Sequence, residues 1–116
     1  MGLAYPQGVT SDGRGKAMYA RMLRMQVKPE RIDEAARLFA EDVVPGCQGQ
    51  AGYRGAYFLV DRQIGECVPI TLWETEADMM ATEENRFFQT QLMRFLGLFH
   101  HGLVREAYEV VVFDRA

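Results

Sequence analysis

The segment "ECVPITLWE" (residues 66–74) most constrains the fold, because it has the character of a strand that is apolar on both sides. Successive side chains of a strand point to opposite faces of its sheet. The two faces of this segment carry Cys67, Thr71 and Trp73 on one side and Val68, Ile70 and Leu72 on the other. A strand with one face in water alternates apolar and polar residues, so we expect both faces of this sheet to be covered.

Three further segments have the period-two pattern of strands. Residues 17–27 and 53–61 alternate in this way, and a last strand is expected over residues 103–114. The turn "DRQIGE" joins residues 53–61 to residues 66–74, which predicts a hairpin. Pro69 has no backbone N–H to donate, so it is expected at an irregular or unpaired position of its strand.

Two segments between these strands have apolar side chains at helical spacing, residues 29–46 and residues 75–99. Pro45 and Gly46 are expected to stop the first helix. Residues 82–85 are expected to divide the second helical region into two pieces. The acidic side chains of this region are read as a solvated helix start that complements the helix dipole.

The order strand, helix, strand, strand, helix, strand leaves one face of the sheet without a cover. Two helices can cover only one face of a four-stranded sheet. A large exposed apolar face usually marks an interface, and the simplest cover is the same face of a second copy. The sequence therefore predicts a homodimer that forms through the sheet face.

Composition bounds the remaining possibilities. A chain of 116 residues forms one domain; residues 1–16, with four glycines, are expected to be a flexible N-terminal arm before a folded domain at 17–116. A net charge of -3 argues against binding to nucleic acid. No apolar run reaches the ~20 residues that cross a membrane, and no signal peptide pattern is present, so a cytoplasmic location is expected. Cys47 and Cys67 are read as reduced thiols, and no metal site is expected.

Over residues 17–114, the chain resembles the antibiotic biosynthesis monooxygenase-like family of dimeric α+β barrels. The motifs that carry the resemblance are "VKP", "PGCQGQAGYRG" and "LWETEAD", in this order and spacing. The resemblance implies an α+β fold: a ferredoxin-like βαββαβ protomer, whose four-stranded antiparallel sheet has helices on one face. The resemblance also implies that two protomers pack sheet to sheet into a barrel, each with a pocket between its sheet and its own helices. Some members oxidise aromatic polyketides with molecular oxygen and no metal or flavin; relatives degrade haem.

Trp73 is the position at which a function of the family could carry over. In the haem-degrading branch a tryptophan here works beside an asparagine of the first strand and a histidine of the second helical region. Neither partner is present in "AMYARMLRMQV" or "ENRFFQTQLM", so haem degradation is the least favoured reading. The alternative reading of Trp73 is a large ring that anchors the helix onto the sheet.

The resemblance and the pattern together give a set of site candidates. The predicted pocket residues are Arg21, Tyr57, Trp73, Phe88, Phe95 and His100, with Trp73 and His100 as catalytic candidates. Arg21 shares a strand face with apolar residues, where it could hold an anionic or phenolate substrate; the alternative is a salt bridge at the sheet edge with Glu106 or Glu109. His100 could carry a proton near neutral pH.

A purely structural role for the two histidines is the alternative to a catalytic role for His100. His100 and His101 are expected near the end of the second helix, where partial positive charge complements the last carbonyl groups. Adjacent helical residues do not face one another, so the two cannot readily grip one metal ion.

Two functions therefore remain. The first is a cofactor-independent monooxygenase that acts on a flat aromatic or polyketide-like molecule, for which no bound cofactor is expected. The second is a non-catalytic module that binds a small ligand in the same pocket.

Overall fold

The computed structural model describes residues 18–114, without the side chains of residues 99–101. The predicted arm at residues 1–16 lies outside the described residues. The described chain forms one four-stranded sheet in the order β2-β3-β1-β4, in which every neighbouring pair is antiparallel. Its strands are β1 (Tyr19–Val27), β2 (Tyr53–Asp61), β3 (Glu66–Trp73) and β4 (Phe99–Glu109). With one helical region after β1 and one after β3, this confirms the predicted ferredoxin-like α+β fold.

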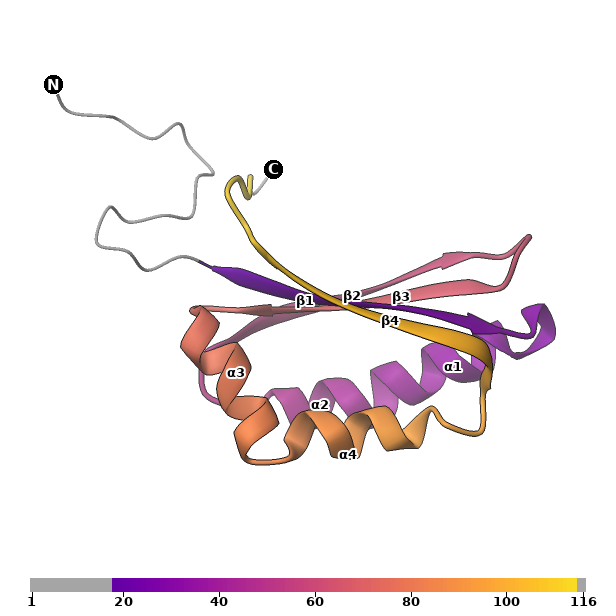
Figure 1. The fold of residues 1–116 in the computed structure, drawn as a ribbon, viewed down its shortest axis with the longest axis horizontal. Helices are drawn as coiled ribbons and strands as arrows, with labels where there is room; N and C mark the ends of the chain where they lie inside the picture. The colour runs from indigo at the N-terminus through magenta and orange to yellow at the C-terminus, as the bar shows by residue number, and fades with distance from the viewer. Residues whose placement is uncertain (1–17, 115–116) are drawn as a thin grey trace, which may run out of the picture.

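The helices form a single layer on one face of the sheet, and no element within residues 18–114 covers the other face, which we call the open face (Figure 1). The first helical region comprises a 3₁₀ turn η1 (Pro29–Arg31), α1 (Ile32–Leu38), a π-helical segment η2 (Phe39–Val43) and α2 (Val44–Cys47). The second comprises α3 (Glu76–Glu84) and α4 (Phe87–Arg94). None of the helices in this part of the chain is long and apolar enough to span a membrane.

The first helix ends at Cys47, one residue beyond the predicted end, but Pro45 does not break it, because the helix runs through Pro45 and Gly46. Proline removes one backbone donor and crowds the carbonyl of the preceding turn. Here the π-helical segment precedes it, and the Val44 N–H donates to the Phe39 carbonyl, five residues back as in a π-helix. Pro45 then falls in the first turn of α2, a position that tolerates proline.

The division of the second helical region is confirmed, and its cause lies at Arg86. This residue has a positive φ of 71°, the left-handed conformation that breaks a helix. The side-chain oxygen of Asn85 accepts a hydrogen bond from the Phe87 N–H at 2.9 Å, which caps the start of α4. At the start of α3, the Thr75 hydroxyl accepts from the Asp78 N–H at 3.0 Å.

The predicted boundary between the second helix and the last strand is wrong. Helix α4 ends at Arg94, and β4 begins at Phe99, so both histidines lie in a strand rather than at a helix end. Phe99 pairs with Val27 and His101 with Gln26, across an irregular register at the end of β1. Pairing with β1 overrides the local spacing of the phenylalanines, which continued the helical phase by coincidence.

The β2–β3 hairpin and the unusual position of Pro69 are both confirmed. On β3, the register with β1 pairs Ile70 with Met22 and Cys67 with Met25, and the two residues between them on each strand are unpaired. Pro69 is one of these residues. Its missing N–H explains the gap in the ladder.

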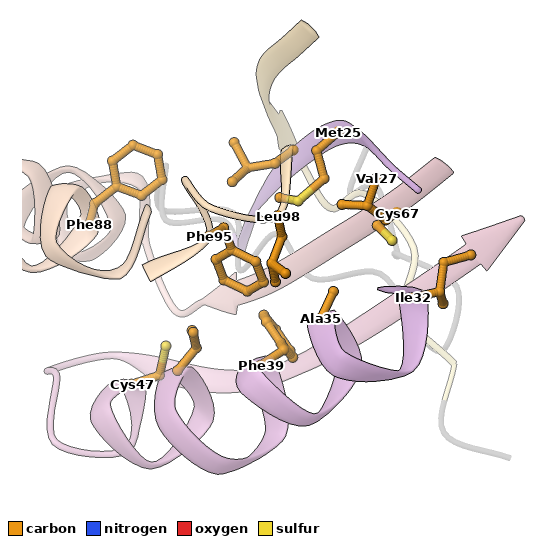
Figure 2. Packing of buried hydrophobic residues seen from close by; sticks show 12 residues of the cluster. Met25, Val27, Ile32, Ala35, Phe39, Cys47, Cys67, Phe88, Phe95 and Leu98 are labelled. Carbon is orange, nitrogen blue, oxygen red and sulfur yellow. The ribbon is translucent and has the colours of Figure 1, made fainter. Parts of the chain in front are cut away.

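The core fills the space between the sheet and the helix layer. Figure 2 shows Ala35 and Phe39 projecting from the first helical region toward Phe95 and Leu98, and all four belong to one buried cluster. The phenyl rings of Phe39 and Phe58 lie 5.2 Å apart between centroids, which joins this helix to β2. The apolar stripes read from the sequence therefore meet as predicted.

The face of the sheet opposite the helices is also apolar, as the sequence predicts. Its half-exposed large side chains are Tyr57, Leu59, Val104 and Tyr108, which are between 49% and 52% exposed. Val68 and Leu72 lie on the same face at the centre of the sheet, largely shielded by neighbouring strands. An apolar face of this extent marks a surface that another molecule covers.

Candidate functional site

A pocket opens between the helix-covered face of the sheet and the second helical region. Its aromatic walls are Phe39, Trp73, Phe87, Phe88 and Phe95, and its polar lining residues are Arg21, Thr71, Thr82 and Gln91. The cavity volume is about 50 Å³, or about 510 Å³ of empty space when the open mouth is included. A buried water needs about 10–15 Å³ of such space, so the smaller figure corresponds to a few water molecules.

Arg21 places a positive charge at the wall of this apolar pocket. It projects from β1 on the helix-covered face, and its side chain is only 6% exposed. Its Nη2 donates to the carboxylate of Glu83 at 3.0 Å and to the Met79 carbonyl at 3.3 Å, both on α3. Its Nε has no hydrogen-bond partner among the residues that the structure describes. A buried donor without a partner is costly, and a ligand oxygen would satisfy it.

The surroundings of Arg21 fix the orientation of its guanidinium. The central carbon of the guanidinium lies 4.0 Å from the centroid of the Phe88 ring, a cation–π contact. Burial lowers the pKa of Arg21 from its ordinary value, while the hydrogen bond and charge of Glu83 act in the opposite direction. The guanidinium stays charged at neutral pH in either case.

Trp73 is both a packing residue and a wall of the pocket. Its indole is 2% exposed, and its ring lies edge-on to Tyr53 with the centroids 5.7 Å apart. Its Nε1 donates to the Thr71 hydroxyl at 2.9 Å, so the indole N–H already has a partner. Thr71 can then donate its own hydroxyl hydrogen to a ligand in the pocket.

Cys47 lines the pocket but has an unreactive thiol. Burial raises the pKa of Cys47 to about 11, and burial also raises the pKa of Cys67. Both cysteines are free and buried. The thiolate is the reactive form of cysteine, so neither residue fits a nucleophile.

We expect native protein to leave both thiols unmodified by Ellman's reagent at about pH 8, where about one Cys47 thiol in a thousand is ionised. As the control, protein unfolded in urea should release two equivalents of thionitrobenzoate, one for each cysteine. The raised pKa affects stability only at high pH. The thiol is neutral in the folded and unfolded states below its unfolded pKa, so its contribution to stability is constant there and falls as pH rises from about 9 toward 11. Rapid stoichiometric labelling of native protein would contradict this assignment.

Four of the six predicted pocket residues, Arg21, Trp73, Phe88 and Phe95, line one cavity. Tyr57 lies instead on the opposite face of the sheet, where it pairs with Ile70 and is 51% exposed. An irregular register between Tyr53 and Gly55 shifts the alternation of β2 and turns Tyr57 away from the helices. The side chain of His100 lies outside the described part of the chain, so its catalytic role stays a prediction.

The salt bridge of Arg21 forms with Glu83, not with either of the two acidic residues expected from the sequence. Glu106 instead pairs with Arg24 at 3.0 Å on the open face. Glu83 was read as part of a solvated helix start, yet its side chain is only 19% exposed. The available signal was its spacing: Met79, Thr82 and Glu83 fall on one side of α3, and a buried arginine needs an acidic partner.

Two further residues that line the pocket, Phe87 and Gln91, were not predicted from the sequence. Phe87 and Gln91 of α4 approach Gly46 of α2, where an added Cβ would lie 3.0 Å from the Phe87 ring. Gly46 therefore allows the two helices to meet closely at this point. Among the side chains that the structure describes, no group of three His, Cys, Asp or Glu residues could hold a metal ion.

Comparison with known sequences assigns this chain to a protein family. Residues 18–90 match the model of the antibiotic biosynthesis monooxygenase family. The uncharacterized protein Rv2557 of Mycobacterium tuberculosis is 39% identical over 70 residues, which cover 60% of this chain and 31% of that protein. The uncharacterized protein Rv2558 is 36% identical over 72 residues, 62% of this chain and 30% of that protein. The chain thus spans about a third of the length of these relatives.

Solved structures share the fold at low sequence identity. SnoaB, a cofactor-independent oxygenase from Streptomyces nogalater, matches with a TM-score of 0.64 and 16% identity, over 79% of this chain and 91% of that one. The monooxygenase from the gene ActVA-Orf6 of Streptomyces coelicolor, in complex with Nanaomycin D, matches with a TM-score of 0.66 and 12% identity, over 86% and 89%. The family match covers well over half of the chain, and on that ground the chain belongs to the antibiotic biosynthesis monooxygenase family.

Proposed function

We propose that this protein is a cofactor-independent monooxygenase that binds a flat, electron-rich aromatic molecule in the pocket between β1, β3 and the second helical region. The observation that carries the proposal is Arg21, a buried cation in an aromatic pocket whose Nε lacks a partner among the described residues. Aromatic walls select a flat ring, and a guanidinium selects an oxygen that bears negative charge. A phenolate or enolate of a polyketide-like ring has both features.

The chemistry asks little of the protein beyond binding. A ring hydroxyl that ionises beside Arg21 releases its proton to water, and its electrons delocalise to the ring carbon that reacts. That carbon then combines with molecular oxygen. In the oxidation of an anthrone, the ring CH₂ loses both hydrogens and gains one oxygen atom, while the second oxygen atom leaves as water. Arg21 stabilises the negative charge throughout, and the walls orient the ring and exclude solvent.

The size of the pocket implies that a ligand moves the helix layer. Pockets for drug-sized ligands have volumes of about 300–1,000 Å³, far above the enclosed volume here. Phe87 and Leu92 of α4 line the pocket, and α4 is bounded by turns at both ends. A ligand of two or three rings therefore displaces these side chains when it binds.

A second function, ligand binding without turnover, is favoured by one specific observation. Among the described residues that line the pocket, those that titrate are Arg21 and Cys47. Arginine stays protonated, and the pKa of Cys47 is raised to about 11 by burial, so neither can accept a proton near neutral pH. If the substrate does not ionise readily beside Arg21, the pocket binds it without oxidising it.

Arg21→Gln is expected to lower kcat/KM for anthrone oxidation about 100-fold, because hydrogen bonds to charged groups contribute about 1.5–3 kcal/mol. An oxygen electrode measures the rate, with protein-free buffer to correct for spontaneous oxidation. Arg37→Gln, on the exposed side of α1, is the matched control and should retain full activity. Full activity of Arg21→Gln would remove Arg21 from the site; tight anthrone binding without oxygen uptake by unaltered protein would favour the second function.

We further propose that two copies of the chain pack through the open sheet face into a dimeric α+β barrel. The support is the group of half-exposed apolar side chains on that face, described above. Arg24 and Glu106, 3.0 Å apart on the same face, would add a polar contact within an otherwise apolar interface.

A further inference from the structure

The carboxylate of Glu83 is shared between two arginines that belong to different strands. Its Oε2 lies 3.0 Å from Nη2 of Arg21 on β1, and its Oε1 lies 3.1 Å from Nη1 of Arg105 on β4. Arg105 pairs with Leu23 in the sheet, which puts it on the helix-covered face beside the pocket. One carboxylate of α3 therefore joins this helix to two strands.

This contact leaves Arg21 little freedom. The guanidinium is held by Glu83 and by the Met79 carbonyl through Nη2, and its face lies against Phe88. Arg105 approaches the same ring at 5.4 Å. The Nε–H, which has no partner among the residues described, is then presented in one fixed orientation. A donor that is already fixed loses less conformational entropy when a ligand binds.

Arg21 lines the pocket and Glu83 and Arg105 are its charged neighbours, so these three residues set the charge on this side of the pocket. Arg21 and Arg105 are cations and Glu83 is an anion, so the cluster carries one net positive charge. In a poorly solvated pocket, a ligand with one negative charge neutralises this cluster, whereas a second negative charge would face Glu83 without compensation.

We propose that Glu83 is a positioning residue that holds Arg21 toward one ligand oxygen and restricts the pocket to ligands with a single negative charge. The inference rests on the proposed function, since it assumes that the aromatic pocket is the ligand site. Beyond the proposed function, the inference specifies the charge of the ligand and names the residue that selects for this charge.

The test compares three probes of similar shape by isothermal titration: 1-naphthoate, the neutral 1-naphthamide and 1-naphthyl phosphate, which is a dianion at about pH 8. The unaltered protein should prefer naphthoate to both others. Glu83→Gln keeps the size of the side chain and raises the net charge of the cluster. In this variant the affinity for naphthyl phosphate relative to naphthoate should therefore rise about tenfold. Arg105→Gln lowers the net charge and should move the preference in the opposite direction, toward the amide, by about threefold because Arg105 is half exposed and screened.

Shifts of probe preference in opposite directions in Glu83→Gln and Arg105→Gln would indicate positioning and charge selection. Structural damage would instead weaken the binding of all three probes. Glu83→Asp keeps the charge and should keep the preference for naphthoate. Glu84→Gln and Arg37→Gln make the same charge changes at exposed positions and should behave as the unaltered protein. Circular dichroism checks that each variant is folded.

Failure of the proposed function and failure of the role of Glu83 give different results in this test. If the unaltered protein binds none of the probes, the proposed function is overturned and this inference with it. If it prefers naphthoate, Arg21→Gln abolishes that preference and Glu83→Gln leaves the preference unchanged, only the role of Glu83 is overturned. That role would also be overturned if Glu83→Gln and Arg105→Gln both lowered the affinity for all three probes by the same factor.

Discussion

Replacing Trp73 by alanine is expected to lower the free energy of unfolding by about 3–5 kcal/mol, the range measured for truncation of large buried aromatic residues. The indole is 2% exposed at the junction of β3 and α3, and its loss removes the edge-on contact with Tyr53 and leaves the Thr71 hydroxyl without its donor. A domain of this size is stabilised by about 5–15 kcal/mol, so the expected loss is a large fraction of the total stability. Urea denaturation followed by circular dichroism measures the change.

Trp73→Phe separates the structural role of this residue from its role in the pocket. The phenyl ring keeps most of the packing, so the loss of stability should be about 1–2 kcal/mol. If Trp73 only packs, the affinity for 1-naphthoate stays unchanged; if it is a wall of the ligand site, affinity falls about tenfold at a similar stability. Leu96→Ala, at an exposed position after α4, is the control and should change stability by less than about 0.5 kcal/mol. A loss below about 1 kcal/mol for Trp73→Ala would contradict the packing assignment.

The first three strands could be predicted from the sequence because their signal is local. The alternation in "YRGAYFLVD" and "ECVPITLWE" reproduces β2 to the residue and β3 to within one. The apolar character of both sheet faces could be read in the same way, since a strand's two faces follow directly from the period of two. These predictions depended on no contact between distant segments.

The errors arose where something other than hydrophobic periodicity decides the structure. Pro45 was expected to end a helix, but the π-helical turn before it moves the hydrogen bonds so that the proline is tolerated. Phe99 continued a helical stripe, but pairing with Val27 draws it into β4. Neither the π-helical turn nor the pairing leaves a local signal that single-sequence periodicity can detect.

The site was predicted in part for the same reason. Arg21 was identifiable because a charge on a core-facing strand position breaks the apolar pattern. Its partner Glu83 is 62 residues away in the chain, and only the packing of α3 on the sheet brings them together. Tyr57 was assigned to the wrong side because one irregular pairing near Gly55 reverses the alternation after it. The arm at residues 1–16 and the cytoplasmic location stay predictions.

The double substitution Leu59→Lys and Val104→Lys is expected to convert a dimer into a monomer. Both side chains are about half exposed on the open face, one on β2 and one on β4, so the lysines cost the isolated protomer little. In a dimer through this face they would place four uncompensated ammonium groups against an apolar surface. Each buried, unpaired charge costs several kcal/mol, so the dissociation constant should rise at least about 100-fold.

Light scattering at micromolar concentration measures this outcome, with twice the chain mass of 13.2 kDa expected for the unaltered protein and the single chain mass for the variant. Met93→Lys is the matched control, because it makes the same change at an exposed apolar position of α4, on the helix layer. It should leave the dimer intact. A folded, unaltered protein that scatters as a single chain would show that the open face is not a contact between copies. Equal dissociation by Met93→Lys would instead show that the helix layer takes part in the contact between copies.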